Sequence, residues 1–260
     1  MPRAAKAPAE QGLSAVRRSK LLERVAAFYH QRFLDRPEGQ QYLVKACGLR
    51  NASLFSDYRI GYADGSLLDA LPRDAEGIEL FRSLGVLIRD DQEALAGCVV
   101  FPLFDATGAL VNLCGRRIVD SKSGDVYLRD EVTGVWNAQA ARRASRLLVT
   151  GSILDALTLV DRGMADAWPR VGQHRLNDDQ ATLLKQCTIK GITVCLPGGE
   201  SPEQIENQLA ALNIPVQIVS LPDRNGLNGY LNRHEIGAFQ KLLPKADLAK
   251  AVASADCRHT

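Results

Sequence analysis

The sequence predicts an α/β protein in which a Rossmann-like parallel sheet follows a mixed α+β N-terminal part. From Arg146 onward, short apolar runs alternate with segments of helical spacing, as in a parallel sheet covered by helices. Before it, residues 98–118 contain two apolar runs joined by a short turn, which indicates an antiparallel hairpin. The 260 residues, 46% of them hydrophobic, are enough for one large or two small domains.

The N-terminal part is predicted to be mainly helical. Residues 1–13 are rich in Ala, Pro and Lys and are expected to form a flexible tail. Apolar residues three and four positions apart predict a helix over about Ser14–Leu34. A second helix is expected over Glu38–Cys47 and a third, capped by Asn51, over Ala52–Tyr58, with further small helices before the hairpin.

The pattern then changes to strands. Cys98–Phe104 and Ala109–Ile118 are the predicted hairpin strands, and Asp105–Gly108 is the turn between them. Residues 127–128 lie in a third short strand. These strands complete a first domain that is predicted over residues 14–144.

The C-terminal part is predicted to be an α/β domain over residues 145–235, followed by a C-terminal helix and tail over 236–260. Its expected strands are Leu147–Thr150, Ala165–Arg170, Gly191–Leu196 and Val216–Leu221. Its expected helices are Ile153–Arg162, Asp178–Cys187 and Pro202–Leu212, the last of them capped by Ser201. This alternation gives parallel strands, because each helix returns the chain to the starting edge of the sheet.

Composition excludes several classes of protein. No run approaches about 18 apolar residues and residues 1–12 lack an apolar signal core, so we expect a cytoplasmic protein without a membrane span. The six cysteines form no C-x-x-C pair and predict reduced, mostly buried thiols rather than a zinc site. A wholly disordered chain is excluded, because the charged fraction of 24% is typical of globular proteins.

The small net charge of +2 hides a regional asymmetry. Residues 1–36 carry eight basic and three acidic side chains (+5), whereas residues 37–115 carry six and eleven (−5). Residues 116–150 carry seven and four (+3), and residues 151–260 carry eleven and twelve (−1). Two basic stretches that flank an acidic one are compatible with a surface that faces phosphate groups.

Three strand ends of the predicted parallel sheet supply the residues for a site. Ligands of such sheets bind beyond the carboxyl ends of the strands. The ends are Thr150–Ser152, Pro197–Glu200 and Pro222–Gly226, and two of the three are rich in glycine. A loop such as Pro197–Gly199 before a helix can cradle a phosphate on its N–H groups, although a tight turn is its commoner role.

These strand ends resemble the TOPRIM domain. Leu147–Leu157 is similar to the first TOPRIM motif, in which a strand is followed by E-(G/S)-x-x-D-A-L. Thr193–Glu200 resembles the second motif, whose strand ends in D-G-D. Leu221–Leu231 resembles the strand that follows and its acidic turn.

The upstream half resembles the N-terminal part of a bacterial-type, DnaG-like primase core. The similar segments are Leu22–Ala63, the strand Val100–Asp105 and the stretch Gly115–Arg117. With the three later motifs, the resemblance covers about residues 21–235 and follows the family's order. It implies a TOPRIM-type Rossmann-like sheet preceded by a mixed α+β primase N-terminal subdomain.

The resemblance also identifies acids of the family that this sequence lacks. The family's catalytic glutamate falls on Gly151, the aspartates of D-G-D on Pro197 and Gly199, and the acid of the later turn on Gly226. A lysine common in such primases falls on Val126, and we expect no zinc ribbon. Because Mg²⁺ is held by carboxylate oxygens, the resemblance implies that the metal site is degenerate.

Three acids remain near the strand ends as candidates for a rearranged metal site, namely Asp155, Glu200 and Asp223. Asp155 is retained from the first motif, and it either supports a metal or offsets a nearby cation. Glu200 has a simpler interpretation as a solvated residue near the positive end of the next helix. We therefore predict no cofactor, with Mg²⁺ bound only if the protein is an enzyme.

Arg116, Arg117 and Arg129 are the predicted nucleic-acid contacts. The resemblance implies that the Gly-Arg pair ends a strand that faces nucleic acid and nucleotide in the family. Alternation along a strand places only one of the two arginines on a given face. A guanidinium is suited to bidentate contact with phosphate, although ordinary surface charge is the alternative for each of them.

Three other side chains, each of a type that can bind a metal or a base, are expected to have packing roles instead. His30 lies in an aromatic helical segment and is expected to pack there, because no Cys or His is spaced to share a metal with it. Trp136 and Trp168 are expected to be buried, with base stacking as the alternative.

The function predicted from these observations is that of a primase-like protein of DNA replication or of a mobile element. It binds single-stranded DNA without polymerase activity, and replication or mobile-element proteins are its expected protein partners. One alternative is an active, divergent DNA primase that makes short RNA primers. A second alternative is a non-catalytic interaction protein.

Overall fold

The computed structural model describes residues 13–71, 74–119, 124–129, 132–172, 175–222 and 224–244. The chain divides into two compact units, and each is described by itself. The first unit contains the described residues up to 40 and those from 59 to 129, and the second contains residues 41–58 and those from 132 onward. The grouping differs from the two continuous domains expected from the sequence, because the segment 41–58 packs with the C-terminal half.

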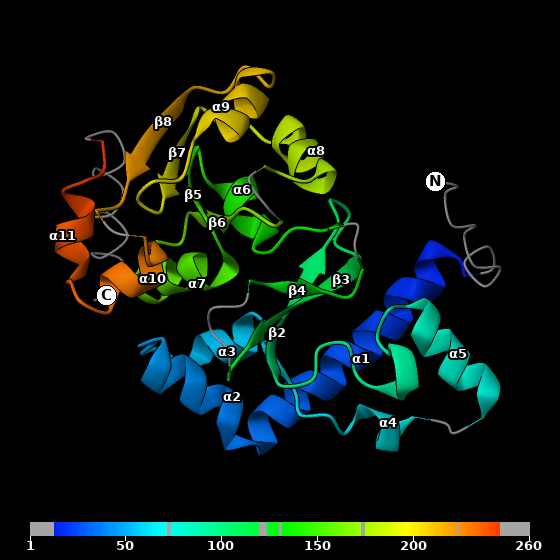
Figure 1. Cartoon of the computed structure of the whole chain (residues 1–260). Helices are drawn as coiled ribbons and strands as arrows, with labels where there is room; N and C mark the ends of the chain where they lie inside the picture. Colours follow the sequence, from blue (N-terminus) through cyan, green and yellow to red (C-terminus); the bar gives the residue numbers. More distant parts are fainter. Residues whose placement is uncertain are drawn as a thin grey trace, which may run out of the picture. The chain divides into compact units, whose positions relative to one another are not determined.

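The first unit contains an antiparallel sheet of four strands (Figure 1). The strands follow one another in space as in sequence, namely β1 (Gly61–Ala63), β2 (Cys98–Phe104), β3 (Leu110–Arg117) and β4 (Val126–Tyr127). The predicted hairpin is confirmed as β2 and β3, and the third strand as β4. The short β1 was not predicted, since a stretch of three residues shows no alternation.

The long helix α1 (Ala15–Asp35) covers this sheet and confirms the predicted N-terminal helix. It begins after Ser14, whose side chain accepts a hydrogen bond from the Arg17 amide. Its buried residues recur at helical spacing, namely Leu22, Val25, Ala26, Tyr29 and Phe33. A Cβ at Gly61 of β1 would lie 2.7 Å from the Cβ of Tyr29, so glycine permits the helix to approach the strand.

The other helices of this unit are short. They are α2 (Pro37–Gln41, whose last residue belongs to the second unit), α4 (Leu67–Ala70), α5 (Ala75–Ser83) and the 3₁₀ turn Arg89–Asp91. The expected single helix over 38–47 is divided, because a π-helical turn over Tyr42–Ala46 follows α2.

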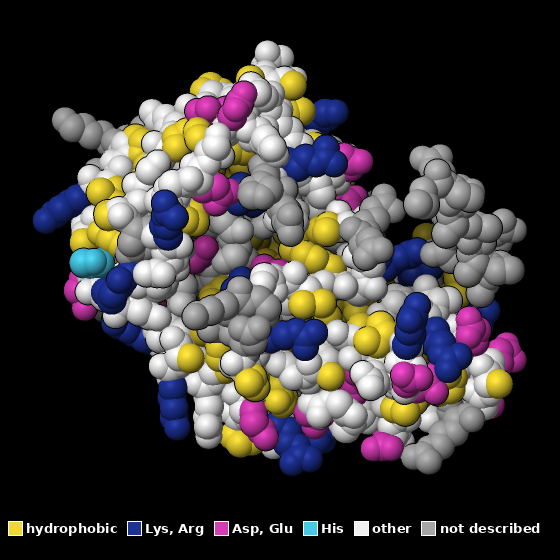
Figure 2. Space-filling model, in the orientation of Figure 1, with side chains coloured by type: hydrophobic (Ala, Val, Ile, Leu, Met, Phe, Trp, Pro, Cys, Tyr) yellow, Lys and Arg dark blue, Asp and Glu magenta, His cyan; other side chains and the backbone are white. Residues whose placement is uncertain are grey.

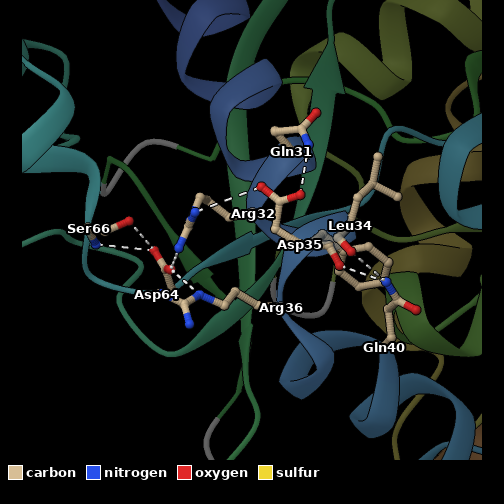
Figure 3. Close-up of polar contacts among 9 residues, drawn as sticks. Gln31, Arg32, Leu34, Asp35, Arg36, Gln40, Asp64 and Ser66 are labelled. Atoms are coloured by element: carbon tan, nitrogen blue, oxygen red, sulfur yellow. Dashed lines mark hydrogen bonds and ion pairs between the residues drawn. The ribbon is translucent and has the colours of Figure 1, made fainter.

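Polar contacts around Asp64 connect the end of α1 to the residues after β1 (Figure 3). The Asp64 carboxylate accepts hydrogen bonds from Arg32 Nε and Nη2 at 2.9 and 2.7 Å. Its other oxygen accepts from Ser66 Oγ at 2.6 Å, and Arg36 Nε lies 3.6 Å away. Partial burial raises the pKa of Asp64, but the hydrogen bonds from Arg32 and Ser66 outweigh it and hold that pKa below its ordinary value.

Replacing Asp64 by Ala is expected to lower the free energy of unfolding by about 1–2 kcal/mol at pH 7, because charged hydrogen bonds are lost. Since the folded-state pKa of Asp64 is lowered, its contribution is present above the unfolded-state pKa and is lost as pH falls through the folded-state value. Urea unfolding of wild type and variant from pH 7 to pH 3 checks this. A difference that stays constant down to pH 3 would contradict the assignment.

The second unit contains a parallel sheet of four strands in the order β6-β5-β7-β8 (Figure 1). Their bounds are Arg146–Thr150 for β5, Ala167–Pro169 for β6, Gly191–Leu196 for β7 and Val216–Ser220 for β8. All four predicted strands are confirmed, and β7 matches its predicted bounds. The central strand β7 is buried throughout, as expected for a parallel sheet covered by helices, whereas the edge strand β8 exposes Gln217 and Ser220.

Helices lie on both faces of this sheet (Figure 1). They are α6 (Ala138–Arg143), α7 (Ile153–Asp161), α8 (Asp178–Gln186), α9 (Glu203–Ala210), α10 (Gly226–Leu231) and α11 (Ile236–Gln240). The predicted cap of α9 is wrong by one residue, because the helix begins at Glu203 and Pro202 holds the cap position. Ser201 Oγ still accepts a long hydrogen bond, 3.4 Å, from the Glu203 amide.

The segment 41–58 is joined to this unit by hydrogen bonds to α7 and α10. Asp161 at the end of α7 accepts from the amides of Arg50 and Asn51 at 2.9 and 2.7 Å. The side chain of Asn228 on α10 donates to the carbonyl of Cys47 at 2.7 Å. Helix α3 (Ser53–Asp57) belongs to the same segment. Its predicted cap, Asn51, is wrong by one residue because Ala52 holds the cap position, although Asn51 Oδ1 accepts a hydrogen bond from the Ser53 amide at 3.1 Å.

Two expectations from composition concerned the cysteines and the hydropathy of the helices. None of the described cysteines forms a disulfide, and all of them except Cys187 are buried. Cys257 lies outside the described residues. Among the helices that the structure describes, none is long and apolar enough to cross a bilayer.

Candidate functional site

The carboxyl ends of the parallel strands meet at one edge of the second unit. Thr150 of β5 pairs in register with Pro169 of β6 and with Cys195 of β7. In the sheet, β6 lies on one side of β5 and β7 lies on the other, so the direction in which strands are added reverses at β5. Ligands of open α/β sheets bind at such a point of reversal, so this edge, here called the carboxyl edge, is the candidate site.

The structure brings together three of the four positions at which the resemblance leads one to expect acids. A Cβ at Gly151 would lie 3.8 Å from both Asp155 Oδ2 and Pro197 Cδ. A Cβ at Gly226 would lie 3.2 and 3.3 Å from the two carboxylate oxygens of Asp155. The fourth position, Gly199, instead adjoins the guanidinium of Arg224. Gly151 and Gly226 therefore both adjoin Asp155, and Pro197 adjoins Gly151.

Asp155 has a structural role at this edge. Its residue is only 7% exposed, and Oδ1 accepts a hydrogen bond from the Asn228 amide at 2.7 Å. Its own amide donates to Ser152, the cap of α7. Asp155 thus connects the first turn of α7 to the start of α10.

A buried ion pair lies at the same edge and was not predicted from the sequence. Arg170 follows β6 directly and is 6% exposed, and its Nη2 donates to Glu200 Oε1 at 2.5 Å. The sequence expectation that Glu200 is merely a solvated residue is therefore wrong. The available signal was the position of Arg170, a lone cation directly after the apolar residues Ala167–Pro169 at a strand end.

The described residues of the carboxyl edge do not fit a divalent cation. Mg²⁺ requires several oxygen ligands, yet Gly151, Pro197, Gly199 and Gly226 supply no carboxylate. Within the described ranges, no three His, Cys, Asp or Glu side chains are grouped to hold a metal. The Glu200 carboxylate is already neutralised by Arg170. The third candidate ligand, Asp223, lies outside the described residues.

The predicted nucleic-acid contacts belong to the first unit. Arg116 and Arg117 end β3, and their side chains differ in exposure, as strand alternation predicts. Arg116 Nε lies 2.7 Å from Asp125 Oδ1 in a pair that is mostly buried, with side-chain exposures of 16% and 14%. Burial raises the pKa of Asp125, and the Arg116 guanidinium offsets only part of that rise. Arg117 is exposed and makes a long contact, 3.5 Å, from Nη1 to the carbonyl of Ala96.

Arg129 is half-buried, and its side chain packs near Gly85, where a Cβ would lie 3.5 Å from its Cγ. On the face drawn in Figure 2, Lys and Arg side chains alternate with Asp and Glu over both units rather than forming one patch. A nucleic-acid surface on this face would therefore depend on a few placed arginines rather than on bulk charge.

The aromatic and histidine candidates are packing residues, as predicted. Trp136 is 1% exposed and stacks on Tyr58 with ring centroids 4.5 Å apart, and Trp168 is fully buried. His30 Nδ1 hydrogen-bonds with the carbonyl of Ile60 at 2.7 Å. These contacts leave neither tryptophan accessible to a base.

No family model matches the sequence, and no curated protein matches it. Solved structures do. The DnaG primase catalytic domain bound to ssDNA is 20% identical with a TM-score of 0.69, over 86% of this chain and 79% of that one. A DNA primase domain from Pseudomonas aeruginosa is 19% identical with a TM-score of 0.70, over 86% and 77%.

The RNA polymerase domain of Mycobacterium tuberculosis primase DnaG, in complex with a double-stranded DNA oligomer with a 6-nucleotide overhang, is also similar. It is 17% identical with a TM-score of 0.67, over 92% of this chain and 80% of that one. Such likeness between sequences so different is a likeness of fold. The chain therefore has the fold of DnaG-type primase catalytic domains.

Proposed function

We propose that this protein is a primase-like, degenerate TOPRIM protein that binds single-stranded DNA and does not synthesise primers. The observation that carries the proposal is the carboxyl edge, where glycine and proline stand at the positions at which the resemblance leads us to expect acids, and where Arg170 pairs with Glu200. Phosphoryl transfer by metal ions needs those acids. The fold that remains is one whose relatives are known in complexes with DNA.

Arg117 is the leading contact for the DNA backbone in this proposal. It is exposed at the end of β3, whereas the neighbouring Arg116 is held by Asp125. In the same proposal, Arg116 and Arg129 are secondary contacts that add positive charge to the DNA-binding surface around Arg117. The absence of a zinc ribbon and an association with replication or mobile-element proteins belong to the same proposal.

The test is fluorescence anisotropy of a labelled single-stranded oligonucleotide with EDTA present throughout. We expect binding that weakens between about 50 and 200 mM salt, since each neutralised phosphate adds about 0.7 to the slope of log affinity against log salt. Replacing Arg117 by Ala is expected to weaken binding about three- to tenfold and to lower that slope by about 0.7.

Arg89→Ala is the matched control, because Arg89 is also exposed in the first unit but lies in a 3₁₀ turn away from β3 in sequence. Affinity that does not respond to salt, or that responds equally to both substitutions, would contradict the proposal. Complete absence of binding would favour the non-catalytic interaction protein.

A further inference from the structure

Arg170 has hydrogen-bond donors that the described part of the chain does not satisfy. Its Nη2 donates to Glu200, but Nε and Nη1 are shielded from solvent and have no partner among the described residues. Buried donors almost always have a partner, and leaving one without costs stability. The two nitrogens therefore point to a group that these residues do not supply.

The position of Arg170 is defined by the sheet. Its amide donates to the carbonyl of Thr150 at 2.9 Å, which fixes it beside the end of β5. A Cβ at Gly151 would lie 4.0 Å from Arg170 Nη2. The guanidinium thus adjoins the position where the family's catalytic glutamate is expected, and it brings a fixed positive charge to it.

A second guanidinium adjoins another of the substituted positions. A Cβ at Gly199 would lie 3.5 Å from Arg224 Nε and 3.6 Å from Arg224 Nη2. Arg224 is exposed, so its charge is accessible to a ligand. Among the described side chains considered at this edge, Arg170 and Arg224 balance Asp155 and Glu200, which leaves no excess negative charge to attract a divalent cation.

We propose that Arg170 and Arg224 take the place of the divalent cation and make the carboxyl edge a metal-independent binding site for a phosphate group. Guanidinium groups suit this role because they stay charged at every working pH and present several N–H donors to phosphate oxygens. The site lies in the second unit, whereas the DNA contacts proposed above lie in the first. The phosphate site can therefore be tested independently of DNA binding.

The first test is titration calorimetry of the full chain with inorganic pyrophosphate in EDTA. One binding site is expected, with an affinity that added Mg²⁺ does not strengthen. Gly151→Glu would place a carboxylate next to Arg170 and is expected to weaken binding at least about tenfold, since it competes for the guanidinium. Gly151→Ala is the matched control and should bind within about twofold of wild type, because its Cβ meets its neighbours at 3.8–4.0 Å, ordinary contact distances.

A second pair of variants tests Arg224 without disturbing a buried residue. Arg224→Ala is expected to weaken pyrophosphate binding about fivefold, which is typical for one lost charged contact at an exposed site. Lys190→Ala removes an exposed charge directly before β7, at the opposite edge of the sheet, and should change nothing. Thermal melts establish that each variant is folded.

Three results would overturn the proposal. They are pyrophosphate binding that requires Mg²⁺ or is absent, unchanged binding by the folded Gly151→Glu variant, and equal losses in Arg224→Ala and Lys190→Ala. The Arg117→Ala variant should bind pyrophosphate like wild type. A failure of DNA binding is in this way distinguished from a failure of the phosphate site.

Discussion

The purified protein is expected to make no RNA primers on a single-stranded template with ribonucleotides and Mg²⁺. Metal ions contribute several kcal/mol to phosphoryl transfer, so their loss predicts a rate at least ~10³-fold below that of an active primase. The carboxyl edge supplies no carboxylate at Gly151, Pro197, Gly199 or Gly226, and Arg170 holds Glu200. Incorporation of labelled nucleotide, with an active DnaG primase as the positive control, measures this directly.

Incorporation that EDTA abolishes would contradict this expectation and support the divergent primase. In that case the double variant Asp155→Asn, Glu200→Gln should remove the activity, because these are the described acids nearest the strand ends. Glu206→Gln is the matched control, since Glu206 is exposed on α9 and away from the end of β7 in sequence. Activity that survived the double variant would exclude Asp155 and Glu200 as ligands.

The sequence predicted well those elements that are defined by residues close together in the chain. Each strand of the parallel sheet is a short apolar run between turns, and the hairpin has two such runs around Asp105–Gly108. The strand β1 was missed because its pairing with Cys98–Val100 is defined by a partner distant in the chain. The grouping of residues 41–58 with the second unit likewise depends on distant contacts, such as those of Asp161.

The candidate site was predicted in part for the same reason. Strand ends are local features, so the sequence could indicate that Gly151, Pro197 and Gly226 lie at one edge of the sheet, where Gly151 and Gly226 adjoin Asp155. The Arg170–Glu200 pair did not, because the two residues are 30 positions apart and each alone has an ordinary surface interpretation. The only sequence signal for the pair was that Arg170 and Glu200 both follow predicted strands of the same parallel sheet.

The pairing of Arg116 illustrates a second limit. Alternation along β3 correctly predicted that Arg116 and Arg117 differ in orientation. It did not indicate which of the two is buried, since that depends on Asp125, which directly precedes β4 and pairs with Arg116. The sequence therefore ranked the two arginines equally, whereas the structure favours Arg117 as the exposed one.

Introducing an acid at Gly226 is expected to destabilise the protein rather than to create a metal site. Gly226 has φ = +69°, a conformation that costs a side chain about 1 kcal/mol, and its Cβ would lie 3.2 Å from the Asp155 carboxylate. A second carboxylate there adds repulsion between like charges in a largely buried place. We expect Gly226→Asp to lower the free energy of unfolding by about 2–4 kcal/mol, as measured by urea denaturation at pH 7.

Gly226→Asn separates the two causes, because asparagine has the shape of aspartate and tolerates this backbone conformation without a charge. The aspartate variant should be less stable than the asparagine variant by about 1–2 kcal/mol at pH 7. The gap should close as pH falls, since protonating one of the paired carboxylates removes the repulsion. Mg²⁺ should not close it, because Asp155 and one added acid lack the further ligands that a metal needs. Recovery in Mg²⁺ by the aspartate variant alone would show that the carboxyl edge still accepts a divalent cation, against the metal-independent site proposed here.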